Sequence, residues 1–386
     1  MKGFFNLSHL SAGFTTVLVG YTSSVVIVIQ AATASGANPA QIESWLLTLG
    51  VVMGLTSILY SWFYKTPIVT AWSTPAAVML AASAGQYSLP VVIGAFMFSG
   101  ALFTLTGMLA PLTRALSKIP VPLGTAMLGA ILLPFCAKAF TPLTDTPALF
   151  ALLFTSYLLA KHFVPRYTML VLLLVSLGSA LALGSFQHAD LALRIATPIW
   201  VMPEFDWLAM LNLALPLYLI TMLSQNLPGI AMLKSYQYDA PIKPILVGTG
   251  LATLMSAPFG GFSVNLAAIS AAICMNEDVD QDKAQRYRAV LWAGGFYLLA
   301  GIFAALVVNL FLALPKPISA MLAGLALLGT LMMCLQSAFK IDEYREPALL
   351  NFVITLSGAT LFGMSATLIG LVIGLAYLRL TTRPRP

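Results

Sequence analysis

Apolar runs long enough to span a membrane follow one another along almost the whole chain, with short polar connections between them. A helix needs about 20 apolar residues to cross a bilayer. Several runs are shorter than this, and the third and tenth contain internal breaks. The pattern predicts an all-α membrane protein with fourteen transmembrane segments, at 11–34, 41–64, 66–85, 89–110, 119–138, 147–163, 167–185, 208–233, 242–256, 258–275, 287–312, 317–336, 347–362 and 365–382.

Composition agrees with a lipid environment. The chain is 59% hydrophobic and 8% charged, whereas a soluble domain has about 25% charged residues. The N-terminal apolar run is interpreted as the first span, because no small-residue cleavage site closes a short apolar core there.

The basic residues indicate how the spans are oriented. If the N-terminus is cytoplasmic and the spans alternate, 16 of the 19 Lys and Arg residues lie inside (19 − 3 = 16), and the three outside are Lys138, Arg194 and Lys316. Such a bias is typical of cytoplasmic loops. It predicts that both termini are cytoplasmic. It also explains the net charge of +6 without a nucleic-acid partner.

Two polar stretches, 66–77 and 257–268, interrupt spans 3 and 10. Each begins near a proline, Pro67 or Pro258, then passes a hydroxyl residue and enters an alanine-rich segment; the two prolines are 191 residues apart (258 − 67 = 191). Broken helices at matching positions in two halves are the best sequence indication of a transporter's substrate site.

A second similarity supports two copies of one unit. Pro120 and Pro122 match Pro315 and Pro317 at an offset of 195 (315 − 120 = 195). Two units of seven spans each must insert in opposite senses, which gives an inverted repeat. Residues 186–207 are predicted to be a solvated periplasmic linker between the repeats.

The breaks predict short extended stretches followed by half-helices. A helix that begins inside the membrane presents free N–H groups and the positive end of its dipole, which can hold an anion without a basic side chain. The two half-helix N-termini are predicted to face each other near the midplane. The predicted cap and first-turn residues are Ser73, Thr74 and Pro75 in span 3, and Ser263, Val264 and Asn265 in span 10.

Other polar residues lie within apolar spans. Gln225 and Asn226 are adjacent carboxamides, which are costly in a membrane unless they are satisfied; each is a candidate for binding substrate or for holding the backbone freed by Pro228. Tyr21 and Ser24 are candidates for substrate contact or for close helix packing.

Aromatic residues near the breaks, Trp72 and Phe262, are candidates to stack on a flat ring or to fill the core. The histidines lie at span ends or in the linker and are predicted to be solvated.

The residues missing from the spans exclude other functions. No Asp, Glu, Lys, Arg or His falls well inside a predicted span, and the three cysteines lie in separate runs without metal-ligand spacing. An intramembrane enzyme needs such groups at depth, and a phosphate-binding loop is also missing. The sequence therefore predicts neither an enzyme nor a cofactor or metal site.

Three motifs together resemble the BenE family of benzoate–proton symporters, over about residues 10–380. They are Gly20-Tyr21-Thr22-Ser23-Ser24, Ala71-Trp72-Ser73-Thr74-Pro75 and Ser224-Gln225-Asn226-Leu227-Pro228-Gly229-Ile230. The resemblance implies the seven-plus-seven inverted-repeat fold shared with uracil permease-type and sulfate permease-type transporters. It also implies a core domain (1–112 and 208–312), a gate domain (113–185 and 313–386), and a homodimer formed through the gate domain.

The function that follows is proton-coupled import of benzoate, or of a similar small aromatic acid, across the bacterial inner membrane. The alternatives are transport or exchange of another organic anion and, from a different class, an anion channel. Nucleobase carriers of this wider fold place carboxylates in spans 8 and 10, where this chain has Gln225, Asn226 and Asn265. This departure favours an anionic substrate and leaves no side chain at depth to carry the proton.

Overall fold

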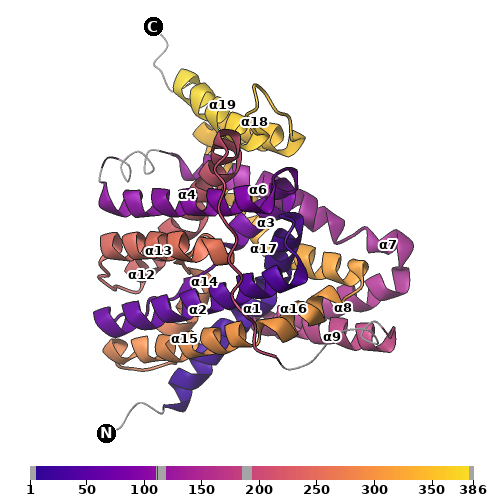
Figure 1. The fold of residues 1–386 in the computed structure, drawn as a ribbon, viewed down its shortest axis with the longest axis vertical. Helices are drawn as coiled ribbons and strands as arrows, with labels where there is room; N and C mark the ends of the chain where they lie inside the picture. Colours follow the sequence, from indigo (N-terminus) through magenta and orange to yellow (C-terminus); the bar gives the residue numbers. More distant parts are fainter. Residues whose placement is uncertain (1–5, 110, 112–118, 185–193, 382–386) are drawn as a thin grey trace.

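The computed structural model describes residues 6–109, 111, 119–184 and 194–381 as one helical body (Figure 1). Both chain ends, the 112–118 segment and the first part of the predicted linker lie outside the described residues. The elements of the first half are α1 (Leu7–Ala34), α2 (Pro39–Tyr64), β1 (Thr70–Ala71), α3 (Thr74–Ser83), α4 (Leu89–Met108), α6 (Val121–Lys138), α7 (Pro142–Asp145), α8 (Pro147–Phe163) and α9 (Thr168–Ala182).

The second half begins with one long, irregular helix. It consists of α10 (Trp207–Ala209), a π-helical turn (Met210–Ala214), α11 (Leu215–Thr221), a second π-helical turn (Met222–Asn226) and α12 (Leu227–Ser235). The remaining elements are α13 (Ile242–Ser256), β2 (Asn265–Leu266), α14 (Ile269–Met275), α15 (Tyr287–Ile302), α16 (Ala304–Leu312), α17 (Lys316–Phe339), α18 (Asp342–Ser357) and α19 (Ala366–Thr381).

The described helices follow the predicted spans closely in position but not all in length. Within the described ranges, eight helices are long and apolar enough to cross a membrane, and α15 with α16 makes a ninth if this pair, bent by 62°, is one span. Others, such as α8 and α19, are apolar but shorter. The count of fourteen crossings stays a prediction.

Strands β1 and β2 join the two halves at their broken spans. They pair antiparallel, with Thr70 opposite Leu266 and Ala71 opposite Asn265, and a half-helix follows each strand. Antiparallel pairing of equivalent segments is the arrangement that two oppositely inserted repeats produce. The pairing also satisfies backbone groups that membrane depth would otherwise leave without partners.

Equivalent elements of the halves lie 195 residues apart: β1 and β2 begin at 70 and 265, α3 and α14 at 74 and 269, and α6 and α17 at 121 and 316. The 191-residue alignment of Pro67 on Pro258 is therefore wrong. Pro258 lies in a 3-10 turn (Ala257–Phe259) that ends α13. Gly260 then adopts a φ of +93°, and the extended segment begins only after it.

Residues 194–206, the described part of the linker, pack against the protein. Arg194 pairs with the buried Glu43 of α2 at 2.5 Å. The backbone N–H of Ile199 donates to Ser44 Oγ, and that of Val201 donates to the Pro258 carbonyl, at 2.8 Å each. The prediction of a solvated linker is therefore wrong over this part, because residues 194–206 pack against α2 and the end of α13.

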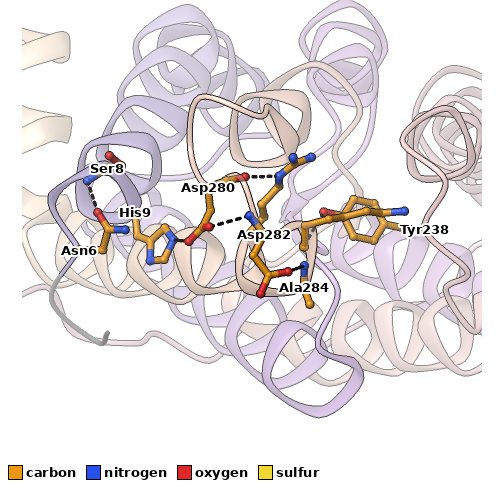
Figure 2. A network of polar contacts seen from close by, with 9 residues as sticks. Asn6, Ser8, His9, Tyr238, Asp280, Asp282 and Ala284 are labelled. Carbon is orange, nitrogen blue, oxygen red and sulfur yellow. Dashed lines mark hydrogen bonds and ion pairs between the residues drawn. The ribbon is translucent and has the colours of Figure 1, made fainter. Parts of the chain in front are cut away.

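A polar network joins the start of α1 to the loop 276–286 that follows α14 (Figure 2). His9 Nε2 lies 2.8 Å from Asp280 Oδ2, and His9 is 1% exposed. Arg286 donates to the carbonyls of Asp280 and Met275, at 2.8 Å each. The prediction that His9 is solvated is wrong, because the turn after α14 folds back over the N-terminus of α1.

Candidate functional site

A cavity of about 510 Å³ lies where both half-helices begin. On one side it is lined by α1, β1, the first residues of α3 and α14, the second π-helical turn and α15. On the other side it is lined by α6 and α17. The volume falls within the range typical of small-molecule sites. None of its described lining residues is Asp, Glu, Lys, Arg or His.

The first half-helix begins as the sequence predicts. Ser73 is the N-cap of α3, and its side chain accepts a hydrogen bond from the Ala76 N–H at 3.2 Å. Pro75 occupies the first turn, where a missing N–H costs nothing. Thr74 and Pro75 line the cavity, whereas Ser73 is fully buried behind them. The positive end of the α3 dipole therefore points toward the cavity.

The second half-helix begins later than predicted. Ser263, Val264 and Asn265 are not its cap and first turn: Asn265 belongs to β2, and α14 starts at Ile269. Ser263 adopts a φ of +44°, and the Asn265 amide donates to its carbonyl at 2.8 Å, which stabilises a turn and an extended segment in place of a helix start. The residues that reach the cavity here are Ala267, Ala268 and Ser270.

Gln225 and Asn226, the adjacent carboxamides of the second π-helical turn, have different environments. Gln225 lines the cavity and is partly exposed. Asn226 is fully buried, and its Oδ1 accepts from the Leu266 N–H of β2 at 3.0 Å. π-Turns often occur at functional sites, and this one supplies one side chain to the cavity and one to the β-pair.

Trp72 and Ser24 form a polar wall between α1 and α3. The Trp72 indole N–H donates to Ser24 Oγ at 2.9 Å, and Ser24 Oγ donates to the Gly20 carbonyl at 2.8 Å. Both side chains line the cavity. Tyr21 lies behind Trp72 with ring centroids 5.2 Å apart, and its hydroxyl is buried without a partner among the described residues.

Phe262 and Val264 lie away from the cavity. The Phe262 ring is fully buried against Trp45 and Phe96, with centroids 5.9 and 5.4 Å apart. Val264 donates its N–H to Thr253 Oγ1 at 3.0 Å. The structure thus brings Ser24, Trp72, Thr74 and Gln225 to the cavity, and leaves Tyr21, Ser73, Asn226, Phe262, Ser263, Val264 and Asn265 outside its lining.

Several lining residues were missed by the sequence reasoning. Tyr297 of α15 lines the cavity and is nearly fully buried. The far wall is a helical stripe on α6 (Val121, Thr125, Leu128 and Leu132) and on α17 (Ala326, Leu327, Thr330, Met333, Cys334 and Ser337). The polar and small residues at helical spacing in α17 could have indicated a cavity-lining face. For Tyr297, the sequence shows only a tyrosine in the middle of an apolar span, which does not indicate a role in the site.

Comparison with known proteins places these features in a family. The chain matches the family BenE, benzoate membrane transport protein, over residues 3–380. It is 40% identical to the inner membrane protein YdcO of Escherichia coli (strain K12), covering 95% of this chain and 93% of that protein. It is 35% identical to the benzoate membrane transport protein of Acinetobacter baylyi (strain ATCC 33305 / BD413 / ADP1), covering 100% and 98%.

Solved structures share the fold at low sequence identity. The transmembrane domain of a cyanobacterium bicarbonate transporter, BicA, superposes with a TM-score of 0.63 at 17% identity, covering 97% of this chain and 98% of that one. SLC26A9 superposes with a TM-score of 0.67 at 13% identity, covering 97% of this chain and 64% of that one. The fold is the seven-plus-seven inverted repeat of these transporters. The chain is a membrane transporter, not an enzyme, and belongs to the BenE family of benzoate membrane transport proteins.

Proposed function

We propose that this protein imports benzoate, or a similar small aromatic carboxylate, together with protons. The substrate is held between the N-termini of α3 and α14, in the cavity that Thr74 and Ser270 line. One observation carries the proposal: a cavity without charged lining residues, among those described, lies where two half-helices begin. Helix N-termini stabilise a carboxylate there, and Trp72 and the apolar residues of α6 and α17 contact the ring.

The family's description and the Acinetobacter relative's name support benzoate as the first substrate to test. Gln225 supports it independently, because a neutral carboxamide donates to a carboxylate without the desolvation cost of a buried cation.

The proposed proton travels on the substrate. Benzoic acid has a pKa near 4, like other unperturbed carboxyl groups, so the anion predominates at neutral pH. Desolvation in an apolar cavity favours its neutral form. The other candidate carriers are the span-end carboxylates Glu43, which is buried against Arg194, and Asp239, which is exposed.

The test is uptake by the purified protein in proteoliposomes. Benzoate uptake is expected to saturate, to show counterflow, and to rise as the outside pH falls. It should keep this pH dependence in Glu43→Gln and Asp239→Asn. Large unitary currents would indicate a channel, and uptake driven by sodium but indifferent to an imposed pH gradient would refute proton coupling. Loss of the pH dependence in one variant would assign the proton to that residue.

The proposed setting is the bacterial inner membrane, with both termini cytoplasmic and a homodimer formed through the gate domain. The distribution of basic residues supports the orientation, and the name of the Escherichia coli relative supports the inner membrane. Ser88→Cys is expected to react with an impermeant thiol reagent from the periplasm, and Gln281→Cys is not; the reverse pattern would contradict the orientation.

The homodimer is tested by light scattering of the purified protein, with the contribution of the detergent subtracted from the measured mass. A monomeric mass would refute the dimer.

A further inference from the structure

We propose that Tyr297 binds the substrate directly, by donating its phenol hydrogen bond to the substrate carboxylate. This inference rests on the proposed function and adds a residue of α15 to the site. Tyr297 is 2% exposed and yet lines the cavity.

The Tyr297 hydroxyl has no protein partner within the described part of the chain, but it is not sealed from the cavity. It differs in this from the Tyr21 hydroxyl, whose oxygen is fully enclosed and unpaired outside the cavity lining. Buried hydroxyls in proteins almost always have a partner. A hydroxyl that lacks one and borders a ligand-sized cavity is expected to find its partner in the ligand.

Several other polar groups at the cavity are already engaged. Ser23 and Ser224 donate to the carbonyls of Gly20 and Ile220, at 3.0 and 2.6 Å. Trp72 donates to Ser24, as described above. Tyr297 therefore stands out among the lining residues as a nearly fully buried donor whose hydrogen bond remains to be made.

The position of Tyr297 is fixed by close helix packing. A methyl group at Gly13 of α1 would lie 2.6 Å from the Ala289 carbonyl oxygen of α15. A methyl group at Gly54 of α2 would lie 2.8 Å from the Gly294 carbonyl oxygen. Small residues at such contacts bring backbones together and hold helices in one arrangement. The hydroxyl is therefore preorganised, which lowers the entropic cost of binding.

The chemistry of the cavity selects a carboxylate as the acceptor. The hydroxyl lies beside Gly20, where an added methyl group would be 3.6 Å from it, and Ser270 at the start of α14 lines the same cavity. A hydrogen bond from a neutral donor to a carboxylate is about twice as strong as one between neutral groups. Tyr297 would thus add a directional hydrogen-bond donor to the positive electrostatic potential at the N-terminus of α3.

The experiment is Tyr297→Phe, which removes the hydroxyl and keeps the ring. Benzoate binding is measured by isothermal calorimetry on the purified full chain, with thermal unfolding as the check on folding. We expect the Kd for benzoate to rise about tenfold, as for loss of a hydrogen bond to a charged group, with little change in melting temperature. Binding of benzamide, which lacks the carboxylate, should change much less.

Tyr218→Phe is the matched control. The Tyr218 hydroxyl is buried against Thr106 Oγ1 at 2.5 Å and does not line the cavity, so this variant should lose stability and keep its affinity.

Equal benzoate affinity in wild type and Tyr297→Phe would overturn the inference, whereas no benzoate binding by wild type would overturn the proposed function itself. If Tyr297→Phe fails to fold, 3-fluorotyrosine at position 297, a stronger donor, should tighten benzoate binding; unchanged affinity would then refute the role.

Discussion

The Trp72 indole nitrogen donates to Ser24 Oγ over 2.9 Å, and this bond joins α1 to the residue that precedes the cap of half-helix α3. Trp72 is 5% exposed, so its N–H depends on this acceptor. The bond fixes the orientation of an aromatic side chain that lines the cavity. The Ser24 hydroxyl is both donor and acceptor here, because it also donates to the Gly20 carbonyl.

Ser24→Ala is expected to leave the indole N–H unpaired and to destabilise the protein by about 1–3 kcal/mol. The Kd for benzoate should also rise, because the Trp72 ring is no longer held in place. A double-mutant cycle with Trp72→Phe, read by thermal unfolding and by calorimetry, measures the coupling. Additive effects of the two substitutions would show that the bond does not position the ring.

Asn226→Ala is expected to destabilise the protein, because the buried Leu266 N–H of β2 loses its acceptor. The expected loss is about 1–3 kcal/mol, measured by thermal unfolding in detergent. Gln225→Ala, one residue earlier, is the matched comparison and should weaken benzoate binding with a much smaller effect on stability. If Asn226→Ala weakened benzoate binding and Gln225→Ala mainly lowered stability, Asn226 would be the residue that binds the substrate.

Gln225→Glu places a negative charge in the cavity while keeping the size of the side chain. Repulsion between two carboxylates disfavours their joint ionisation, so benzoate binding at neutral pH should be largely lost and should partly return as the pH is lowered. Gln237→Glu, on an exposed turn, is the control for added charge. Normal affinity in Gln225→Glu at neutral pH would contradict the proposed site.

All three cysteines are buried, but Cys334 lines the cavity, whereas Cys136 and Cys274 lie outside its lining. A small methanethiosulfonate reagent is therefore expected to modify Cys334 first in the purified protein, and saturating benzoate should slow the reaction. Mass spectrometry identifies the modified thiol, and Cys334→Ala is the control. Modification at an unchanged rate with benzoate present would place the substrate elsewhere.

Much of the architecture follows from the chain alone, because the lipid environment restricts the possibilities. Long apolar runs must form helices that satisfy their own backbone groups, so the approximate positions of the helices could be predicted from hydropathy. Ser73 followed by Thr74 and Pro75 carries its own capping signal, and α3 begins there as predicted. The recurrence of Pro120 and Pro122 at Pro315 and Pro317 contained the true repeat offset of 195.

The tertiary structure decided what local sequence leaves open. Ser263, Val264 and Asn265 resemble a helix start, but pairing with β1 keeps Asn265 extended and delays α14 to Ile269. Gln225 and Asn226 are chemically alike and adjacent, and only the position of β2 gives one to the cavity and the other to the scaffold. Tyr297 reaches the cavity because glycine contacts bring α15 against α1 and α2. Local signals determine where helices lie, whereas contacts between distant segments determine which side chains meet.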